Sequence, residues 1–232
     1  MSAIEHGMLF SAPMVRAILA GRKSQTRRVV TSKNSLVDGS PPCMKRDPEI
    51  LGAWHNLDFT DAFVDPGPSP AGNPGPYLRV ADAPNESRHR VYPRVQPSDR
   101  LWVRETWCQV PGGDDYVYRA DLSDEHRLDE LAVRRSAGAL ATSWRPSIFM
   151  PRRAARIVLT VSGVRAQRLQ DITDADALGE GVPGLNAFRA LWESINGHRP
   201  GCAWADNAWV WALAFERVEL NRAREQALSE VR

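Results

Sequence analysis

The chain has 232 residues, of which 43% are hydrophobic and 25% are charged, as in ordinary soluble globular domains. Its net charge of +2 excludes a protein that is held on DNA by bulk electrostatics. Its longest apolar run, Ala208–Phe215, is too short for a transmembrane helix.

The first stretch of the chain predicts a strand, a helix and a turn in succession. Met8–Phe10 is short and apolar, as in a strand, and Ser11 is a suitable N-cap for a helix that tolerates a proline in its first turn. Apolar residues then recur at helical spacing, and Gly21 is a typical stop at the helix C-terminus. Because residues 22–28 are all polar, the next strand is expected to begin at Val29.

Residues 38–97 differ in composition from the rest of the chain, since eleven of the 17 prolines fall there. Proline donates no backbone hydrogen bond and breaks helices. The segment is therefore predicted to be a loop-rich, Pro/Gly-rich insertion with one or two short strands, such as Tyr77–Val80. We expect it to lie within a single domain that spans residues 1–232.

Regular structure is expected to resume with a strand at Leu101–Trp107. Alternate side chains of a strand point to opposite faces, which places Glu105 among apolar residues. A carboxylate in such surroundings needs a partner or a purpose. Glu105 is therefore expected either to pair with an arginine such as Arg27 or Arg28 or to be the acid of a cleft.

The remaining sequence predicts strands and helices that alternate without a βαβ rhythm. In chain order these are a helix at Ser123–Arg135, a half-buried strand at Ala155–Val164, a short helix capped by Thr173 or Asp174, an amphipathic helix at Ala187–Ile195, a buried strand at Trp209–Phe215 and a charged tail at 221–232. This pattern favours an α+β fold in which a small mixed or antiparallel β-barrel carries helices at its rim.

Four ordered blocks resemble a known family. Residues Gly21–Arg28 read GRKSQTRR, a helix-end pattern that resembles the ASCH domain of the PUA-like superfamily. The other blocks are Asp99–Trp107 (DRLWVRETW), Leu169–Val182 (LQDITDADALGEGV) and the closing strand Trp209–Phe215. Together they look like the longer ASCH proteins common in bacteriophage genomes and prophages, and the resemblance covers residues 7–35 and 97–219.

The resemblance implies a PUA-like β-barrel flanked by helices, with a cleft on one side. Small members of the family are similar to N4-acetylcytidine amidohydrolases, which use a Lys, a Thr and a Glu. Carried across by motif, these residues are Lys23, Thr26 and Glu180, and Arg28 matches the arginine that closes the motif. The implied function is a hydrolase that removes an acyl group from the exocyclic amine of an N4-acetylcytidine-like nucleoside or modified base.

Two mechanisms are open for these three residues. In the first, Thr26 forms an acetyl-enzyme and a neutral Lys23 is the base, which requires the lysine pKa to fall from about 10.4 toward roughly 7–8. In the second, Glu180 activates water while Lys23 and Thr26 position the acyl oxygen. Burial and nearby arginines would lower the lysine pKa, whereas a close Glu180 would raise it.

The expected substrate-binding residues share polar or aromatic character and lie in the same blocks. They are Arg27, Arg28, Arg104, Glu105, Trp107 and Ser24. Trp107 is either a core residue or a stacking surface for a base, and Ser24 is a rival hydroxyl to Thr26.

Each expected catalytic residue also has a purely structural explanation. Lys23 follows a helix end, where the helix dipole favours a cation. Thr26 is explained equally well as a turn or strand residue that bonds its own backbone, and Glu180 as a solvated carboxylate at a helix end.

The chain departs from the small enzymes in two respects. It is more than twice as long, and Phe149 stands where phage-type relatives often carry His. Two other functions therefore remain open: a non-catalytic module that binds modified bases in RNA or DNA, which needs an aromatic and arginine cleft, and a nuclease.

No cofactor or metal is expected. The cysteines Cys43, Cys108 and Cys202 form no CxxC pair, and the histidines have no ligand spacing. The expected partners are a small nucleoside or modified base and, in the alternative function, RNA or DNA, with no membrane. The first ten residues lack a secretory pattern, so a bacterial or phage-infected host cytoplasm is the expected location.

Overall fold

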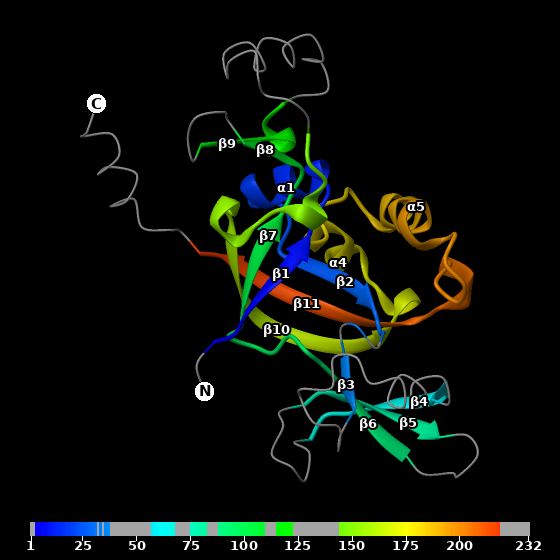
Figure 1. The fold of residues 1–232 in the computed structure, drawn as a ribbon. Helices are drawn as coiled ribbons and strands as arrows, with labels where there is room; N and C mark the ends of the chain where they lie inside the picture. Colours follow the sequence, from blue (N-terminus) through cyan, green and yellow to red (C-terminus); the bar gives the residue numbers. More distant parts are fainter. Residues whose placement is uncertain are drawn as a thin grey trace. The chain divides into compact units, whose positions relative to one another are not determined.

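The computed structural model of the protein describes residues 3–31, 33, 35–37, 57–67, 75–82, 88–109, 115–122 and 144–218. The predicted helix at 123–135 and the predicted tail at 221–232 lie outside the described residues. The described residues form sheets with few helices, which confirms the α+β class (Figure 1). No helix in this part of the chain has the length and apolar character needed to cross a membrane.

Contacts within the chain define two compact units. The first unit contains Met1–Ser24, Asp99–Thr160 and Phe215–Arg232, and the second contains Gln25–Ser98 and Val161–Ala214. The expected insertion, residues 38–97, falls entirely within the second unit.

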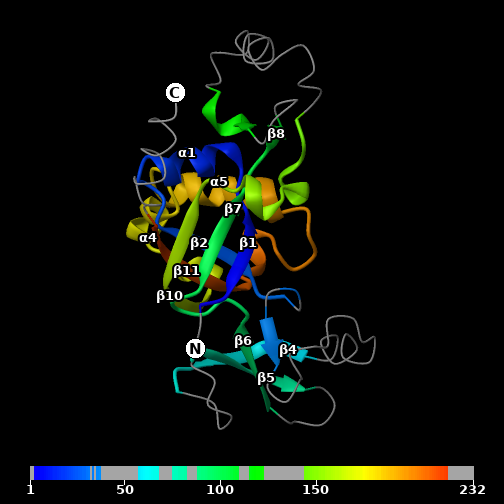
Figure 2. The same ribbon diagram turned by 60° about the vertical axis from the view of Figure 1, so that its left-hand side comes forward.

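The largest sheet has the strand order β1-β7-β10-β11-β2. Its strands are β1 (Glu5–Leu9), β7 (Arg100–Arg104), β10 (Val158–Arg168), β11 (Trp209–Arg217) and β2 (Gln25–Val29). In the first unit β1 runs parallel to β7, with Met8 opposite Val103, and the two strands lie side by side in both views (Figures 1 and 2). Among the described strands no pairing joins β1 to β2, so these strands do not form the closed barrel that the sequence predicts.

Strand β2 begins earlier than the sequence predicts. It starts at Gln25 rather than at Val29, and it pairs antiparallel with β11, with Arg27 opposite Ala212. The polar residues 25–28 therefore form a strand because they hydrogen-bond to the apolar, buried β11, although their own pattern does not indicate one.

The first unit begins with the strand and helix that the sequence predicts. Helix α1 (Ala12–Leu19) follows β1, and its N-cap is Ser11. Gly21 ends the helix with a φ of 69°, in the left-handed region that favours glycine. The predicted strand at 101–107 is split, since β7 ends at Arg104 and β8 (Trp107–Gln109) pairs with β9 (Tyr116–Tyr118).

The second unit contains a four-stranded antiparallel sheet with the order β3-β6-β5-β4. Its strands are β3 (Ser35–Val37), β4 (Leu57–Asp65), β5 (Tyr77–Asp82) and β6 (Arg88–Pro93). The expectation of one or two short strands in the insertion was wrong. The prolines that suggested loops lie mainly between the strands, so they do not interrupt the hydrogen-bond ladders.

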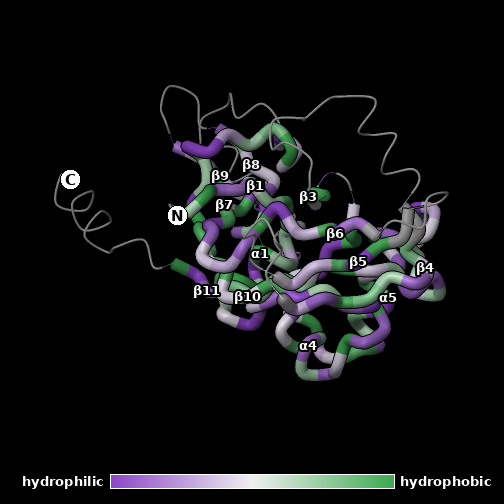
Figure 3. Tube along the Cα trace, turned by 90° about the horizontal axis from the view of Figure 1, so that it is seen from below, coloured by the Kyte–Doolittle hydropathy of each residue, from purple (hydrophilic) through white to green (hydrophobic). Residues whose placement is uncertain are grey.

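The helices of the second unit pack on a core that includes β11. Helix α4 (Asp174–Gly179) begins at the N-cap Thr173, whose hydroxyl accepts from the Asp176 amide, as predicted. Helix α5 (Leu185–Asn196) carries both hydrophobic and hydrophilic residues (Figure 3) and buries Phe188 and Trp192. The core cluster consists of Leu169, Ile172, Ala177, Phe188, Trp192 and Val210.

Candidate functional site

The three residues expected to be catalytic are all buried. Lys23 is 3% exposed, Thr26 is 3% exposed and Glu180 is 5% exposed. Lys23 lies in the first unit, while Thr26 and Glu180 lie in the second. Lysine and glutamate are rarely buried to this extent without a partner or a function.

Lys23 directly follows the C-terminal turn of α1. The backbone amides of Arg22 and Lys23 both donate to the carbonyl of Ala17, at 2.9 and 3.1 Å. These bonds, together with the left-handed Gly21, fix the chain as it leaves the helix. The local backbone therefore places Lys23 at a helix C-terminus, where a cation is favourable, and the near-complete burial excludes a solvated surface lysine.

Thr26 and Arg28 share one face of β2, and Arg27 lies on the other. Thr26 is opposite Leu213 in β11, and Arg28 is opposite Trp211. Successive side chains of a strand alternate between faces, whereas directly opposite residues share a face. The motif that the resemblance identified therefore presents Thr26 and Arg28 together.

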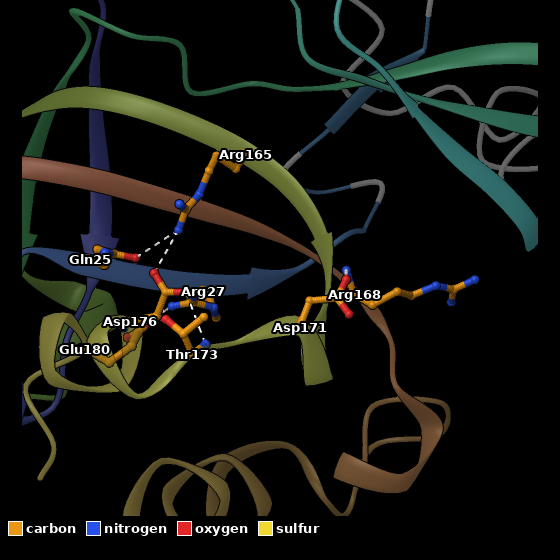
Figure 4. Close-up of polar contacts among 8 residues, drawn as sticks. All are labelled: Gln25, Arg27, Arg165, Arg168, Asp171, Thr173, Asp176 and Glu180. Carbon is orange, nitrogen blue, oxygen red and sulfur yellow. Dashed lines mark hydrogen bonds and ion pairs between the residues drawn. The ribbon is translucent and has the colours of Figure 1, made fainter. Parts of the chain in front are cut away.

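Arg27 joins β2 to α4 through two ion pairs. Its Nη1 donates to Oε1 of Glu180 at 3.0 Å, and its Nη2 lies 3.1 Å from Oδ2 of Asp176 (Figure 4). The Arg27 side chain is fully buried, and its guanidinium lies over the Phe188 ring. Glu180 is thus not a solvated helix-end carboxylate, because a buried arginine fixes its position.

Asp176 extends this group to β10. Its Oδ1 accepts from Arg165 at 2.9 Å, and the same Arg165 nitrogen donates to Oε1 of Gln25 at 3.4 Å. Burial raises the pKa of Asp176, but hydrogen bonds from Arg165 and Thr173 and the charge of Arg27 outweigh it and hold the pKa well below its ordinary value. Asp176 therefore stays ionised in the folded protein.

Asp176 and Arg165 are not among the residues that the sequence predicts for this site. A local signal was present for Asp176, because it is the third residue after Thr173 and completes a capping box. Arg165 carried no such signal, since its partners Gln25 and Asp176 depend on the packing of β10.

The charge of Glu180 also affects the ionisation of the Arg28 guanidinium. Burial lowers the pKa of the Arg28 guanidinium, and the negative charge of Glu180 opposes this effect. The Glu180 carboxylate therefore interacts with arginines on both faces of β2. Within the second unit, Glu180 is thus bound directly by the buried Arg27 and acts on the half-buried Arg28 through its charge.

Glu105 has a different partner from the two arginines expected. It accepts two hydrogen bonds from Arg156, at 2.9 and 3.1 Å, and is 1% exposed. Arg156 also pairs with Asp121 at 2.7 Å and stacks on the Tyr118 ring. The prediction of Arg27 or Arg28 failed because sequence does not show which arginine packs against the end of β7.

Burial dominates the ionisation of this group in the first unit. It raises the pKa of Glu105, and the hydrogen bond and charge of Arg156 offset only part of this effect. Burial likewise raises the pKa of Tyr118 to about 12. Two hydrogen bonds from Arg156 hold Glu105 inside the protein. This arrangement matches the expected pairing with an arginine and not the acid of a cleft.

Three further residues of the predicted site lie in the first unit. Arg104 donates to the carbonyl of Ile148, and its guanidinium lies over the Trp102 ring. Trp107 is 2% exposed, so its ring is a core surface in this structure and offers no open face to a base. Ser24 is exposed, and its carbonyl accepts from the Phe215 amide at 2.9 Å.

A pocket of about 290 Å³ lies in the second unit, next to the insertion. It is lined by Val29, Val30, Phe59, Thr60, Arg168, Gly201, Asp206, Ala208 and Trp209. None of the predicted site residues lines this pocket. Its walls come partly from β4, which shows that the insertion contributes to the surface of this unit.

Comparison with models of known protein families, with curated proteins and with solved structures finds no match. Among the residues that the structure describes, no three His, Cys, Asp or Glu side chains are placed to hold a metal ion. The geometry of the buried polar group and the motif resemblance are therefore the observations on which a function can be proposed.

Proposed function

We propose that the protein is a hydrolase that removes an acyl group from the exocyclic amine of an N4-acetylcytidine-like nucleoside or modified base. The observation that carries the proposal is the burial of Lys23, Thr26 and Glu180, the three residues that the motif assigns to catalysis. We further propose that the fold is PUA-like and related to the ASCH domain.

The reaction consumes one water and breaks the bond between the acyl carbon and the exocyclic nitrogen. In one route Thr26 attacks the acyl carbon, and Lys23 takes the hydroxyl proton and passes it to the amine as the C–N bond breaks. Water then releases the acid from the threonine ester. In the other route Glu180 takes a proton from water, the water oxygen attacks the same carbon, and Glu180 returns the proton to the amine as the C–N bond breaks. Arg27 is a positioning residue in the second route, because it fixes Oε1 of Glu180.

The test is chromatographic. Purified protein is mixed with N4-acetylcytidine and the release of cytidine is followed, with Lys23→Arg, Thr26→Ala and Glu180→Gln beside the wild type. We expect turnover in the wild type and its loss in the Lys23 and Thr26 variants, because arginine stays protonated and alanine has no hydroxyl. Matched controls are Lys33→Arg and Glu216→Gln, which change exposed residues of the same types and should retain activity.

Mass spectrometry of the protein during turnover separates the two routes. An acetyl group on Thr26 supports the first route, and its absence in an active enzyme supports the second. Turnover that survives Lys23→Arg would exclude Lys23 as the base. A wild type that releases no cytidine from acylated cytidines but binds modified nucleotides would replace the proposal with the binding module.

A further inference from the structure

Two large apolar side chains are held outward on the first unit. Phe149 is 70% exposed and Ile148 is 57% exposed, in the 3-10 turn Ser147–Phe149. The turn is closed by hydrogen bonds from the amides of Phe149 and Met150 to Pro146 and Ser147. Met150, the next residue, is buried, so the backbone holds both side chains away from the core.

The sequence around this turn is rich in arginine and contains no acidic residue. Between Trp144 and Thr160 the chain has four arginines and no Asp or Glu. Arg145, Arg152 and Arg153 are exposed. Arg104 reaches the turn from β7 and donates to the carbonyl of Ile148. We call Arg104, Arg145, Ile148, Phe149, Arg152 and Arg153 the arginine–aromatic surface.

Two of these arginines form no ion pair in the described part of the chain. Their guanidinium groups lie over indole rings instead, Arg104 over Trp102 at 5.2 Å and Arg145 over Trp107 at 5.3 Å. A guanidinium stacked in this way keeps its charge and is held at a fixed place. Both charges are therefore available for an anionic partner.

The other two arginines have polar partners within the first unit. Arg152 donates two hydrogen bonds to Glu5, at 2.8 and 3.2 Å, but both side chains are more than a third exposed, so solvent screens the pair. Arg153 donates to the hydroxyl of Tyr116 at 3.0 Å. The contact with Glu5 does not prevent Arg152 from turning toward a phosphate group.

We propose that the arginine–aromatic surface binds single-stranded nucleic acid, with Phe149 stacking on an unpaired base and the arginines contacting phosphates. Single strands are bound by basic surfaces that carry exposed aromatic rings, because every base has a face on which to stack. A membrane surface is the weaker alternative, since only two apolar side chains protrude here. This inference goes beyond the proposed function and does not depend on it.

The test uses fluorescence anisotropy with a labelled oligouridylate, a labelled oligodeoxythymidylate and a labelled duplex of equal length. None of these carries an acyl group, so the result is independent of hydrolysis. We expect the single strands to bind more tightly than the duplex, and Phe149→Ala to weaken binding by roughly tenfold. If three arginines each contact a phosphate, the logarithm of the affinity should fall with the logarithm of salt with a slope of about −2.

Two matched controls identify the surface. Phe63→Ala removes another exposed phenylalanine, and Arg189→Gln removes another exposed arginine that lies over a tryptophan, Trp204. Both should bind as the wild type does, whereas Arg145→Gln should bind more weakly and with a smaller salt slope.

Three results would overturn the proposal. The first is equal binding by Phe149→Ala and the wild type, and the second is no binding of single strands at low salt. The third is binding to vesicles of phosphatidylcholine and phosphatidylserine that depends on Phe149, without affinity for the oligonucleotides, which would assign the surface to a membrane.

Discussion

Asp176 shows how one half-buried carboxylate depends on its neighbours. Arg165 and Thr173 donate to it and Arg27 adds a positive charge, so its folded-state pKa lies below the ordinary value of 3.8. A carboxylate with a lowered pKa stabilises the fold above that ordinary value, and the stabilisation is lost as the pH falls toward the folded-state pKa.

We therefore predict that Asp176→Asn lowers the free energy of unfolding by about 2 kcal/mol at neutral pH, because a neutral amide cannot match two arginines. The difference from the wild type should shrink as the pH falls below 3.8. Urea unfolding at several pH values measures it. Asp61→Asn, at an exposed position on β4, should show neither effect. A difference that is independent of pH would assign the loss to the helix cap alone.

Glu105 shows what the sequence reveals about a single residue. Strand alternation placed this carboxylate among apolar neighbours, and its 1% exposure agrees with that prediction. The partner could not be predicted, because Arg156 is 51 residues away and is one of 27 arginines. Burial of a charge can be inferred from a local pattern, but the identity of its counter-ion depends on tertiary packing.

At the scale of elements, the turn after α1 gives a direct test of backbone geometry. Gly21 has a φ of 69°, whereas Gly163 in β10 does not adopt a positive φ, and a Cβ atom at either position would meet no heavy atom within 4 Å. Substitution by alanine therefore isolates the backbone effect from any clash. We predict that Gly21→Ala destabilises the protein by about 1 kcal/mol, while Gly163→Ala does not.

Thermal or urea unfolding of the two alanine variants measures this difference. Because Lys23 follows the same turn, the activity of Gly21→Ala on N4-acetylcytidine is a useful second readout. Equal stability of both variants would show that the left-handed turn does not constrain the end of α1.

The elements that sequence predicts well carry local signals. Helices α1, α4 and α5 were predicted because their caps and apolar spacing lie within a few residues of each other. Strand β2 was missed because its polar residues form a strand only by pairing with β11. The sheet in the insertion was underestimated because the many prolines obscured the strands between them.

At the scale of the whole molecule, the insertion is attached to the rest of the second unit through an irregularity in β4. The register of β4 against β5 shifts between Asp58 and Phe63. Within this bulge, Nη2 of Arg168 donates to the carbonyls of Phe59 and Thr60, and the Trp209 indole donates to Phe59. Arg168 also stacks on Trp209 at 4.5 Å, so one arginine joins three segments of chain.

We predict that Arg168→Met increases amide hydrogen exchange in the β3–β6 sheet and leaves exchange in β1 and β7 unchanged. Methionine fills a similar volume but donates no hydrogen bond, so the carbonyls of the bulge lose partners. Hydrogen exchange with mass spectrometry resolves the two regions. Arg189→Met, which changes an exposed arginine of the same unit, is the control. Faster exchange throughout the protein would instead indicate a global loss of stability.

The polar sequence of β2 has a consequence for solubility during folding. This strand ends the order of the five-stranded sheet, and the terminal strand of an open sheet can pair with another chain and start aggregation. Arg27 and Arg28 occupy the centre of β2, where an ordinary strand would carry valine or isoleucine. Until α4 packs against β2 and its carboxylates pair with arginine, the two adjacent positive charges repel a second copy of the same strand. The residues proposed to support the site therefore also act as gatekeepers against intermolecular sheet formation.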